Sequence, residues 1–268
     1  MAEIAAETHH HGHDVGERLY IHNHTFIHEL APHIKILSGL LFIVVAVSTP
    51  ISNFYAYICF FILIFLALAL AKLSFKTVAL RSLIEIPFVL FAFLMPFFGT
   101  GPSFELLGFT IYEDGIESGV AIIAKGTLGI LTAILISSTT TARELLRGLE
   151  TLKLPALMVQ IASFMLRYIN VVNDEMERMR IARASRGFEA TGLRHWKVLA
   201  HSIGALFIRS YERGERVHLA MISRGYSGLM PRDIHVESSV LEFLKGFSLP
   251  LLAFVAAVVT RVIGAVGV

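Results

Sequence analysis

The sequence is short of charged residues and of cysteine, and both shortages limit the class of protein. Charged residues make up 16% of the 268 residues and hydrophobic residues 55%, whereas soluble domains carry about a quarter charged residues. The single cysteine, Cys59, lies in an apolar run, which excludes a disulfide framework and a cysteine-based zinc site. The polar N-terminus lacks the apolar stretch of a cleavable signal peptide. A net charge of +2 is too small to indicate nucleic acid binding. We therefore expect a protein of the lipid bilayer.

Long apolar runs take the place of the missing charge. The segment from Ile36 to Ala71 contains no Asp, Glu, Lys or Arg, and Pro50-Ile51-Ser52-Asn53 predicts a tight turn within it. We predict about five transmembrane helices, at residues 34–49, 54–71, 85–99, 119–140 and 247–265. The predicted fold class is an all-α polytopic membrane protein with a cytoplasmic helical coupling module.

The charges between the runs predict the orientation. Segment 72–84 carries Lys72, Lys76 and Arg81 and no acid, whereas segment 100–118 carries four acids and no Lys or Arg. The positive-inside rule places the first in the cytoplasm and the second outside. The N-terminus is then cytoplasmic and the C-terminus outside, in a multi-pass protein of the cell (inner or plasma) membrane. The predicted domains are a His-rich segment (1–33), a membrane domain of four spans (34–140), a cytoplasmic coupling module (141–246) and a last span (247–268).

Segment 154–172 is apolar enough to be counted as a further span. Its polar residues follow one another at helical spacing and form one stripe: Gln160, Ser163, Arg167, Asn170 and Asp174. A span facing lipid would leave these groups without partners. We interpret the segment as an amphipathic helix lying along the membrane or against other helices.

Two charges lie within the predicted spans beyond their first turns. Lys125 and Arg261 are expected to reach the outer headgroups with their long side chains. Glu85 begins the third span on the cytoplasmic side, at a different depth from Lys125, so we do not expect the two to pair.

Three helices are predicted in the coupling module. Thr141 and Glu144 fit a capping box that opens a short helix ending before Pro155. A second helix begins near Asn173, with Asp174, Glu175 and Glu177 in its first turn, and a third runs from about Ser202 to Arg224. The second helix is predicted to end at Gly187 and the third at Gly225, because glycine is the usual left-handed residue after a helix.

One short phrase occurs at both of these helix ends. Ala182 to Phe188 and Ala220 to Tyr226 both read Ala-x-x-Ser-Arg-Gly-aromatic, 38 residues apart. Either copy alone is an ordinary helix end, since arginine offsets the helix dipole and glycine ends the helix. The repetition favours docking, in which a guanidinium flanked by small residues contacts a partner's carboxylate.

These motifs resemble those of the transmembrane T component of energy-coupling-factor (ECF) transporters, of the cobalt/nickel type (CbiQ family). The resemblance rests on the paired motifs, usually Ala-Arg-Gly, and on three further segments: Ala31-Pro32-His33-Ile34-Lys35-Ile36-Leu37, Tyr112-Glu113-Asp114-Gly115-Ile116, and residues 140–155. The family's opening motif has Asp-Pro-Arg, so Ala31 and His33 depart from it. Serine replaces the first alanine in both coupling motifs.

The resemblance implies that each motif inserts into one of two ABC ATPase subunits, and that the chain transmits their motion to a substrate-binding integral membrane S component. The coupling residues are then Ser185, Arg186, Gly187, Ser223, Arg224 and Gly225. ATP and Mg²⁺ would bind the partners, and no cofactor or catalytic residue is expected on this chain, which lacks the phosphate-binding motif G-x-x-x-x-G-K-[ST].

Histidines gather near the N-terminus, with eight of twelve in the first 33 residues. Imidazoles bind cobalt, nickel and zinc, so the candidate metal ligands are His9, His10, His11, His13, His22, His24 and His28. A soluble tail without metal is the alternative. Cobalt or nickel is the leading cargo and a vitamin the alternative. A self-contained metal channel or carrier would need ligands at mid-membrane depth, which the spans almost lack, and no paired carboxylates indicate a membrane enzyme.

Overall fold

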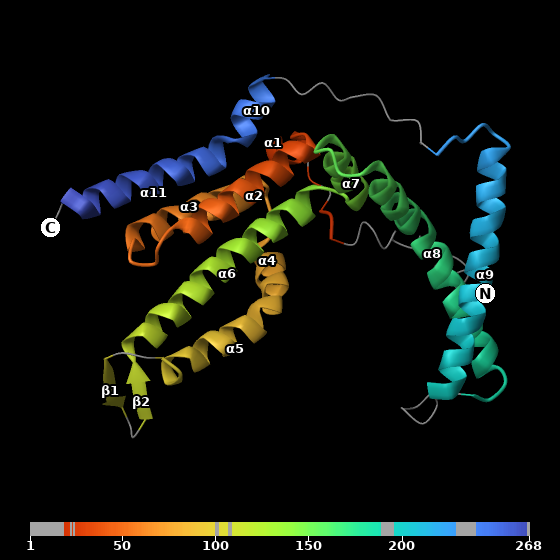
Figure 1. Cartoon of the computed structure of the whole chain (residues 1–268), viewed down its shortest axis with the longest axis horizontal. Coiled ribbons are helices and arrows are strands. Elements are labelled where there is room, and N and C mark those ends of the chain that lie inside the picture. The colour runs from red at the N-terminus through yellow and green to blue at the C-terminus, as the bar shows by residue number, and fades with distance from the viewer. Residues whose placement is uncertain are drawn as a thin grey trace, which may run out of the picture. The chain divides into compact units, whose positions relative to one another are not determined.

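The computed structural model describes residues 19–21, 23, 25–99, 102–106, 109–188, 196–228 and 240–266. These residues are mostly helical and fall into two compact units, each of which is considered by itself (Figure 1). The membrane unit comprises the described residues within Leu19–Leu152 and Val236–Val268. The coupling unit comprises those within Lys153–His235.

The membrane unit contains most of the elements. They are α1 (Phe26–Glu29), α2 (Pro32–Ser48), α3 (Phe54–Leu70), α4 (Phe75–Ser82), η2 (Leu83–Glu85), α5 (Ile86–Leu94), η3 (Met95–Phe97), β1 (Ser103–Leu106), β2 (Phe109–Tyr112), α6 (Glu113–Thr139), α7 (Ala142–Thr151), α10 (Val240–Gly246) and α11 (Ser248–Val266). The coupling unit contains α8 (Ala156–Ala184) and α9 (Trp196–Ile222).

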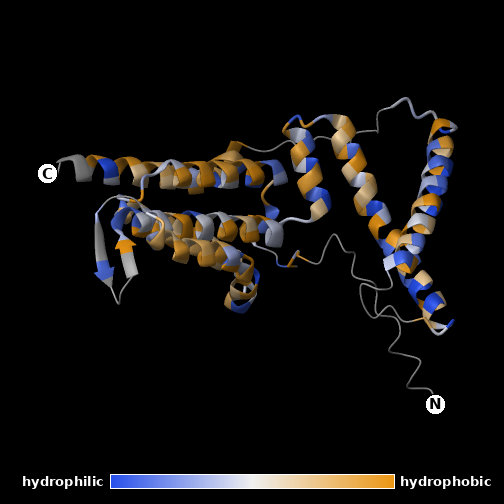
Figure 2. Cartoon of the chain, turned by 60° about the horizontal axis from the view of Figure 1, so that its bottom comes forward, coloured by the Kyte–Doolittle hydropathy of each residue, from blue (hydrophilic) through white to orange (hydrophobic). Residues whose placement is uncertain are grey.

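The core of the membrane unit lies among α2, α3, α6 and α11, which pack side by side (Figure 1). Phe42, Phe60 and Ile64 are fully buried there, together with Leu128 of α6 and Ala253 of α11. The outward faces are also apolar, as Figure 2 shows by colour, and α5 exposes almost all its side chains. An apolar surface of this kind is suited to lipid, which confirms the predicted all-α membrane fold.

The third predicted span is longer than expected. Helical structure continues from Phe75 to Phe97 through α4, η2, α5 and η3, and its axis changes direction between α4 and α5 (Figure 1). Glu85 therefore lies in the middle of this helix and not at its start. Its buried carboxylate accepts a hydrogen bond from the Thr127 hydroxyl (2.7 Å). The predicted start of this helix at residue 85 was wrong, because the charges of segment 72–84 were interpreted as a loop although part of that segment is helical.

Glu85 and Lys125 are not paired in the structure, although Glu85 lies close to the turn of α6 that contains Lys125. The Lys125 ammonium donates instead to the Val47 carbonyl at the end of α2 (2.9 Å). A cation at a helix C-terminus offsets the negative end of the helix dipole.

Segment 100–118 also contains structure that the sequence did not predict. Strands β1 and β2 pair antiparallel, with Ser103 opposite Tyr112, and α6 begins at Glu113 and not at residue 119. Small residues let the start of α6 approach the preceding helix, since a Cβ on Gly115 would lie 2.5 Å from the Met95 carbonyl oxygen.

Three helices among the described residues are long and apolar enough to cross a membrane: Phe75–Phe97, Glu113–Thr139 and Ala156–Ala184. Helices α10 and α11 qualify as a fourth if their 45° bend lies within one span. Helices α2 and α3 are shorter apolar helices of 17 residues each, joined by the predicted turn, in which the Asn53 N–H donates to the Pro50 carbonyl (3.1 Å). Because α8 qualifies, its interpretation as a non-spanning helix stays a prediction.

The coupling unit differs from its prediction in where both of its helices begin. Helix α8 is continuous from Ala156, so no helix begins near Asn173, and the acidic residues 174, 175 and 177 lie in its middle. The proposed role of these acids at a helix N-terminus was wrong. No glycine or proline occurs between Pro155 and Gly187, so nothing interrupts the helix. Helix α9 begins at Trp196, earlier than the predicted Ser202.

Candidate functional site at two helix ends

The first coupling motif closes the C-terminus of α8. The Phe188 N–H donates to the Arg183 carbonyl (3.1 Å). The Gly187 N–H donates to the Ala184 carbonyl (2.9 Å), and Gly187 adopts φ +73°. This pair of bonds is the Schellman motif, which satisfies carbonyls that have no partner within the helix. A Cβ on Gly187 would meet no atom within 4 Å, so the left-handed backbone alone requires glycine.

The second motif closes α9 with the same bonds. The Tyr226 N–H donates to the Met221 carbonyl (3.0 Å). The Gly225 N–H donates to the Ile222 carbonyl (2.9 Å), and Gly225 adopts φ +85°. The two helix ends are therefore equivalent in backbone conformation as well as in sequence.

The serines of the two motifs are also equivalent. The Ser185 hydroxyl donates to the Ala182 carbonyl (3.1 Å), and the Ser223 hydroxyl donates to the Ala220 carbonyl (2.9 Å). Each serine thus satisfies an acceptor in the last turn of its helix. The repeated serine therefore has a local role that alanine, its usual counterpart in the family, cannot fulfil.

The two motif arginines are exposed, and their side chains have no hydrogen bond or ion pair within the described part of the chain. Arg186 and Arg224 lie at the tips of α8 and α9. Other arginines of these helices are engaged, including Arg183, which donates to the Ser202 hydroxyl (2.8 Å). Arg167, Arg178 and Arg213 share the lack of a described partner, so exposure alone does not single out the motif arginines. What distinguishes the motif arginines is that each lies in a copy of the same helix end.

Side-chain bridges set the direction of α8 against α9. Gln160 near the start of α8 bonds the Tyr226 hydroxyl, Glu175 in its middle pairs with Arg209, and Arg183 near its end bonds Ser202. Residue numbers rise along α8 as they fall along α9, so the helices are antiparallel (Figure 1). The motifs therefore lie at opposite ends of the pair, separated by about the length of α9, which at 27 residues is roughly 40 Å.

Sequence reasoning missed these bridges, although one signal was available. Gln160 belongs to the polar stripe of segment 154–172, and its partner Tyr226 is the aromatic residue of the second motif.

Between the helices lies an apolar cavity of about 620 Å³, lined by Phe164, Tyr168 and Leu206 among others.

Most of the predicted metal ligands lie outside the part of the chain that the structure describes. His9, His10, His11, His13, His22 and His24 lie outside the described residues. His28 is described, and its ring bonds the Thr25 hydroxyl (2.6 Å) and the Ile21 carbonyl (3.2 Å). No group of three or more His, Cys, Asp or Glu side chains within the described residues could hold a metal ion.

Fold and site together define a polytopic helical membrane protein that carries two equivalent helix ends on an antiparallel helix pair. Residues 23–236, which contain both motifs, match the CbiQ family, described as "Cobalt transport protein". The chain belongs to this family and is the transmembrane T component of an energy-coupling-factor transporter, a complex that includes ATPase and other membrane subunits.

Several relatives match most of the chain. The energy-coupling factor transporter transmembrane protein EcfT of Bacillus subtilis is 30% identical, covering 78% of this chain and 83% of the relative. The EcfT of Streptococcus thermophilus is 31% identical, covering 78% and 84%. An uncharacterised protein of Methanocaldococcus jannaschii is 32% identical, covering 80% and 81%.

Proposed function

We propose that Arg186 and Arg224 dock this chain onto two ABC ATPase subunits and that the chain passes their ATP-driven movement to a substrate-binding membrane subunit. The observation that carries the proposal is the equivalence of the two helix ends, which share the same hydrogen bonds and a left-handed glycine, at opposite ends of an antiparallel pair. Two equivalent tips suit two equivalent partners. Each guanidinium is free among the described residues to make a bidentate contact with a carboxylate.

The cytoplasmic side is where ATPases can reach these tips. The positive-inside rule supports a cytoplasmic N-terminus and a cytoplasmic coupling module. ATP and Mg²⁺ would then bind the ATPase subunits, and this chain would supply positioning and transmission.

Charge reversal of both motif arginines tests the docking. We expect Arg186→Glu with Arg224→Glu to abolish co-purification of the ATPase subunits while the protein still inserts into the membrane. Each single reversal should weaken it. The matched control reverses Arg180 and Arg216, which are exposed on the same helices but away from the tips (side chains 72% and 69% exposed). Normal co-purification of the doubly reversed protein would refute the docking.

The proposed cargo is cobalt or nickel ion, with a vitamin as the alternative. The family description and the histidine-rich segment support a metal. Deleting residues 1–13 and replacing His22 and His24 should lower ⁵⁷Co²⁺ or ⁶³Ni²⁺ uptake by the complete complex. His28 is replaced separately, because its ring has structural partners. Unchanged uptake and metal binding would remove the histidines from the proposal, and uptake by the chain alone in liposomes would favour a self-contained carrier.

A further inference from the structure

Both ends of the segment that carries the coupling motifs attach to one place on the membrane unit. The chain leaves α6 at Thr140 and continues at once into α7, and it returns through α10. Helices α7 and α10 both pack on the first turn of α2, Pro32–Lys35, which we term the α2 anchor.

Helix α7 contacts the anchor through a glycine. A Cβ on Gly148 would lie 2.9 Å from the His33 backbone nitrogen and 3.0 Å from the Pro32 carbonyl carbon. These are backbone atoms that cannot give way as a side chain can. The capping box of α7 fixes the start of the same helix, with Glu144 accepting from the Thr141 N–H (2.8 Å).

Helix α10 also contacts the anchor through a glycine, here against a side chain. Gly246 is buried against the Ile34 side chain, and a Cβ there would overlap with it. The His33 ring lies next to the Phe243 ring, with centroids 5.9 Å apart. The segment that carries both coupling motifs is thus held at its two ends by neighbouring residues of one helical turn.

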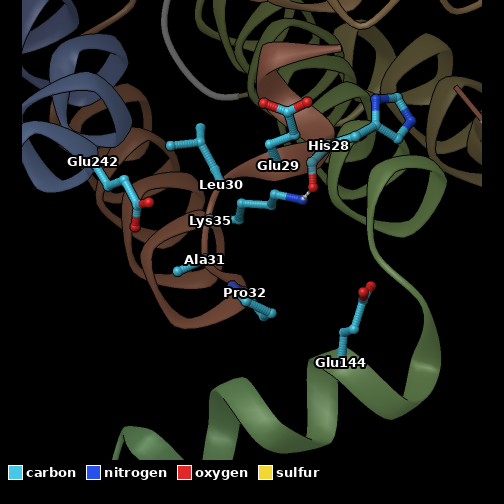
Figure 3. Close-up of a pocket in the computed structure, with 8 residues that line it drawn as sticks. All are labelled: His28, Glu29, Leu30, Ala31, Pro32, Lys35, Glu144 and Glu242. Atoms are coloured by element: carbon cyan, nitrogen blue, oxygen red, sulfur yellow. Dashed lines mark hydrogen bonds between the residues drawn. The ribbon is translucent and has the colours of Figure 1, made fainter. Parts of the chain in front are cut away.

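Lys35 joins the anchor to the point where the chain leaves α6. Its ammonium donates to the carbonyls of His28 and Thr139 (both 2.9 Å) and to the Thr140 hydroxyl (3.3 Å). These acceptors match the three hydrogens of the group, and the residue is only 6% exposed. Lys35 lines a cavity of about 280 Å³. Figure 3 shows Glu144 of α7 and Glu242 of α10, which also line it.

We infer that the α2 anchor is where movement of the coupling segment passes to the membrane helices, and that Lys35 is its positioning residue. The inference rests on the proposed function. The contact of α7 with backbone atoms of the anchor and the packing of Gly246 of α10 against the buried Ile34 side chain both transmit displacement, because close-packed interiors are barely compressible. Helix α2 in turn packs against α6 and α11, so displacement of the anchor moves the core.

Hydrogen exchange measures this transmission without knowledge of the cargo. The complete complex with its ATPase and substrate-binding subunits is placed in nanodiscs, and exchange of α2 is compared with and without ATP. We expect Lys35→Met and Gly148→Ala to keep the ATPases bound but to reduce the ATP-dependent change in α2 about tenfold, within the range of typical coupling between sites. The matched control is Gly129→Ala in α6, where a Cβ meets no atom within 4 Å, and it should behave as the parent chain.

Each outcome decides between the two proposals. An undiminished ATP-dependent change in Gly148→Ala or Lys35→Met would overturn the inference and leave ATPase docking intact. Retained ATPase binding after reversal of Arg186 and Arg224 would overturn the docking instead. If Lys35→Met fails to assemble, the pair Gly148→Ala and Gly129→Ala decides, because alanine favours the helix at both positions. Exchange of α3 without ATP should be unchanged, which separates transmission from a general loss of structure.

Discussion

The membrane unit and the coupling unit of this protein are held together by different kinds of contact. Four helices of the membrane unit enclose a core that includes Phe42, Phe60 and Ile64. In the coupling unit, Val159 is the only buried residue within the described parts of α8 and α9. Those two helices are joined largely by bridges between long side chains, and large apolar residues such as Phe207 and Tyr211 stay exposed. Exposed apolar surface of this extent is typical of regions that contact other molecules.

A phenylalanine truncation in each unit gives the largest expected contrast. Phe60 is fully buried and Phe207 is 70% exposed. We expect Phe60→Ala to cost about 3–5 kcal/mol of unfolding free energy, through lost packing and a cavity, and Phe207→Ala to stay within about 0.5 kcal/mol. Unfolding of the isolated chain in detergent measures both. Equal losses would mean that α9 is packed as firmly as the membrane core.

Glycine-to-alanine substitutions sharpen the same contrast. A Cβ on Gly119 of α6 would lie 2.7 Å from the Ala92 carbonyl oxygen, whereas a Cβ on Gly204 of α9 meets nothing within 4 Å. Gly119→Ala should destabilise by about 1–3 kcal/mol through overpacking. Gly204→Ala should stabilise by up to about 1 kcal/mol through helix propensity. The sign of the shift in thermal midpoint distinguishes them, and a loss at Gly204 would reveal packing against α9.

Glycines at the helix ends test backbone conformation and not packing. Gly225→Ala should cost about 1–2 kcal/mol, because alanine is strained at a left-handed φ. Gly214→Ala lies within the same helix, and a Cβ there also meets no atom within 4 Å, so this variant serves as the control and should not destabilise. Amide exchange at the end of α9 should quicken only in the first variant. Unchanged exchange there would show that the left-handed turn does not hold this helix end.

The bridge between α8 and α9 gives the smallest expected effect. Glu175→Gln removes the ion pair with Arg209, whose side chain is 60% exposed. We expect a loss of about 0.2–1 kcal/mol that shrinks as salt is added, since water and ions screen exposed pairs. Thermal midpoints at low and high salt measure it, with Glu212→Gln as the control for a looser pair on α9 alone (4.0 Å). A large, salt-independent loss would mean that this bridge is shielded from solvent.

Local sequence patterns predicted the features that depend on a few neighbouring residues. The capping box at Thr141, the turn at Pro50 and the helix ends at Gly187 and Gly225 are all present. The start of α4 was missed because charge was interpreted as a loop, and the continuity of α8 was missed because three acids resembled a helix start. In both places the helix begins earlier in the sequence than residue type suggested.

The sequence by itself determined the membrane class, the family and the two equivalent helix ends, because hydropathy, capping and left-handed glycines act over one or two helical turns. Only the tertiary structure placed those ends at opposite tips of an antiparallel pair. It also decided that Lys35 bonds Thr139, 104 residues away. Contacts of that separation depend on how α2, α6, α7 and α10 pack together, and no local pattern carries that information.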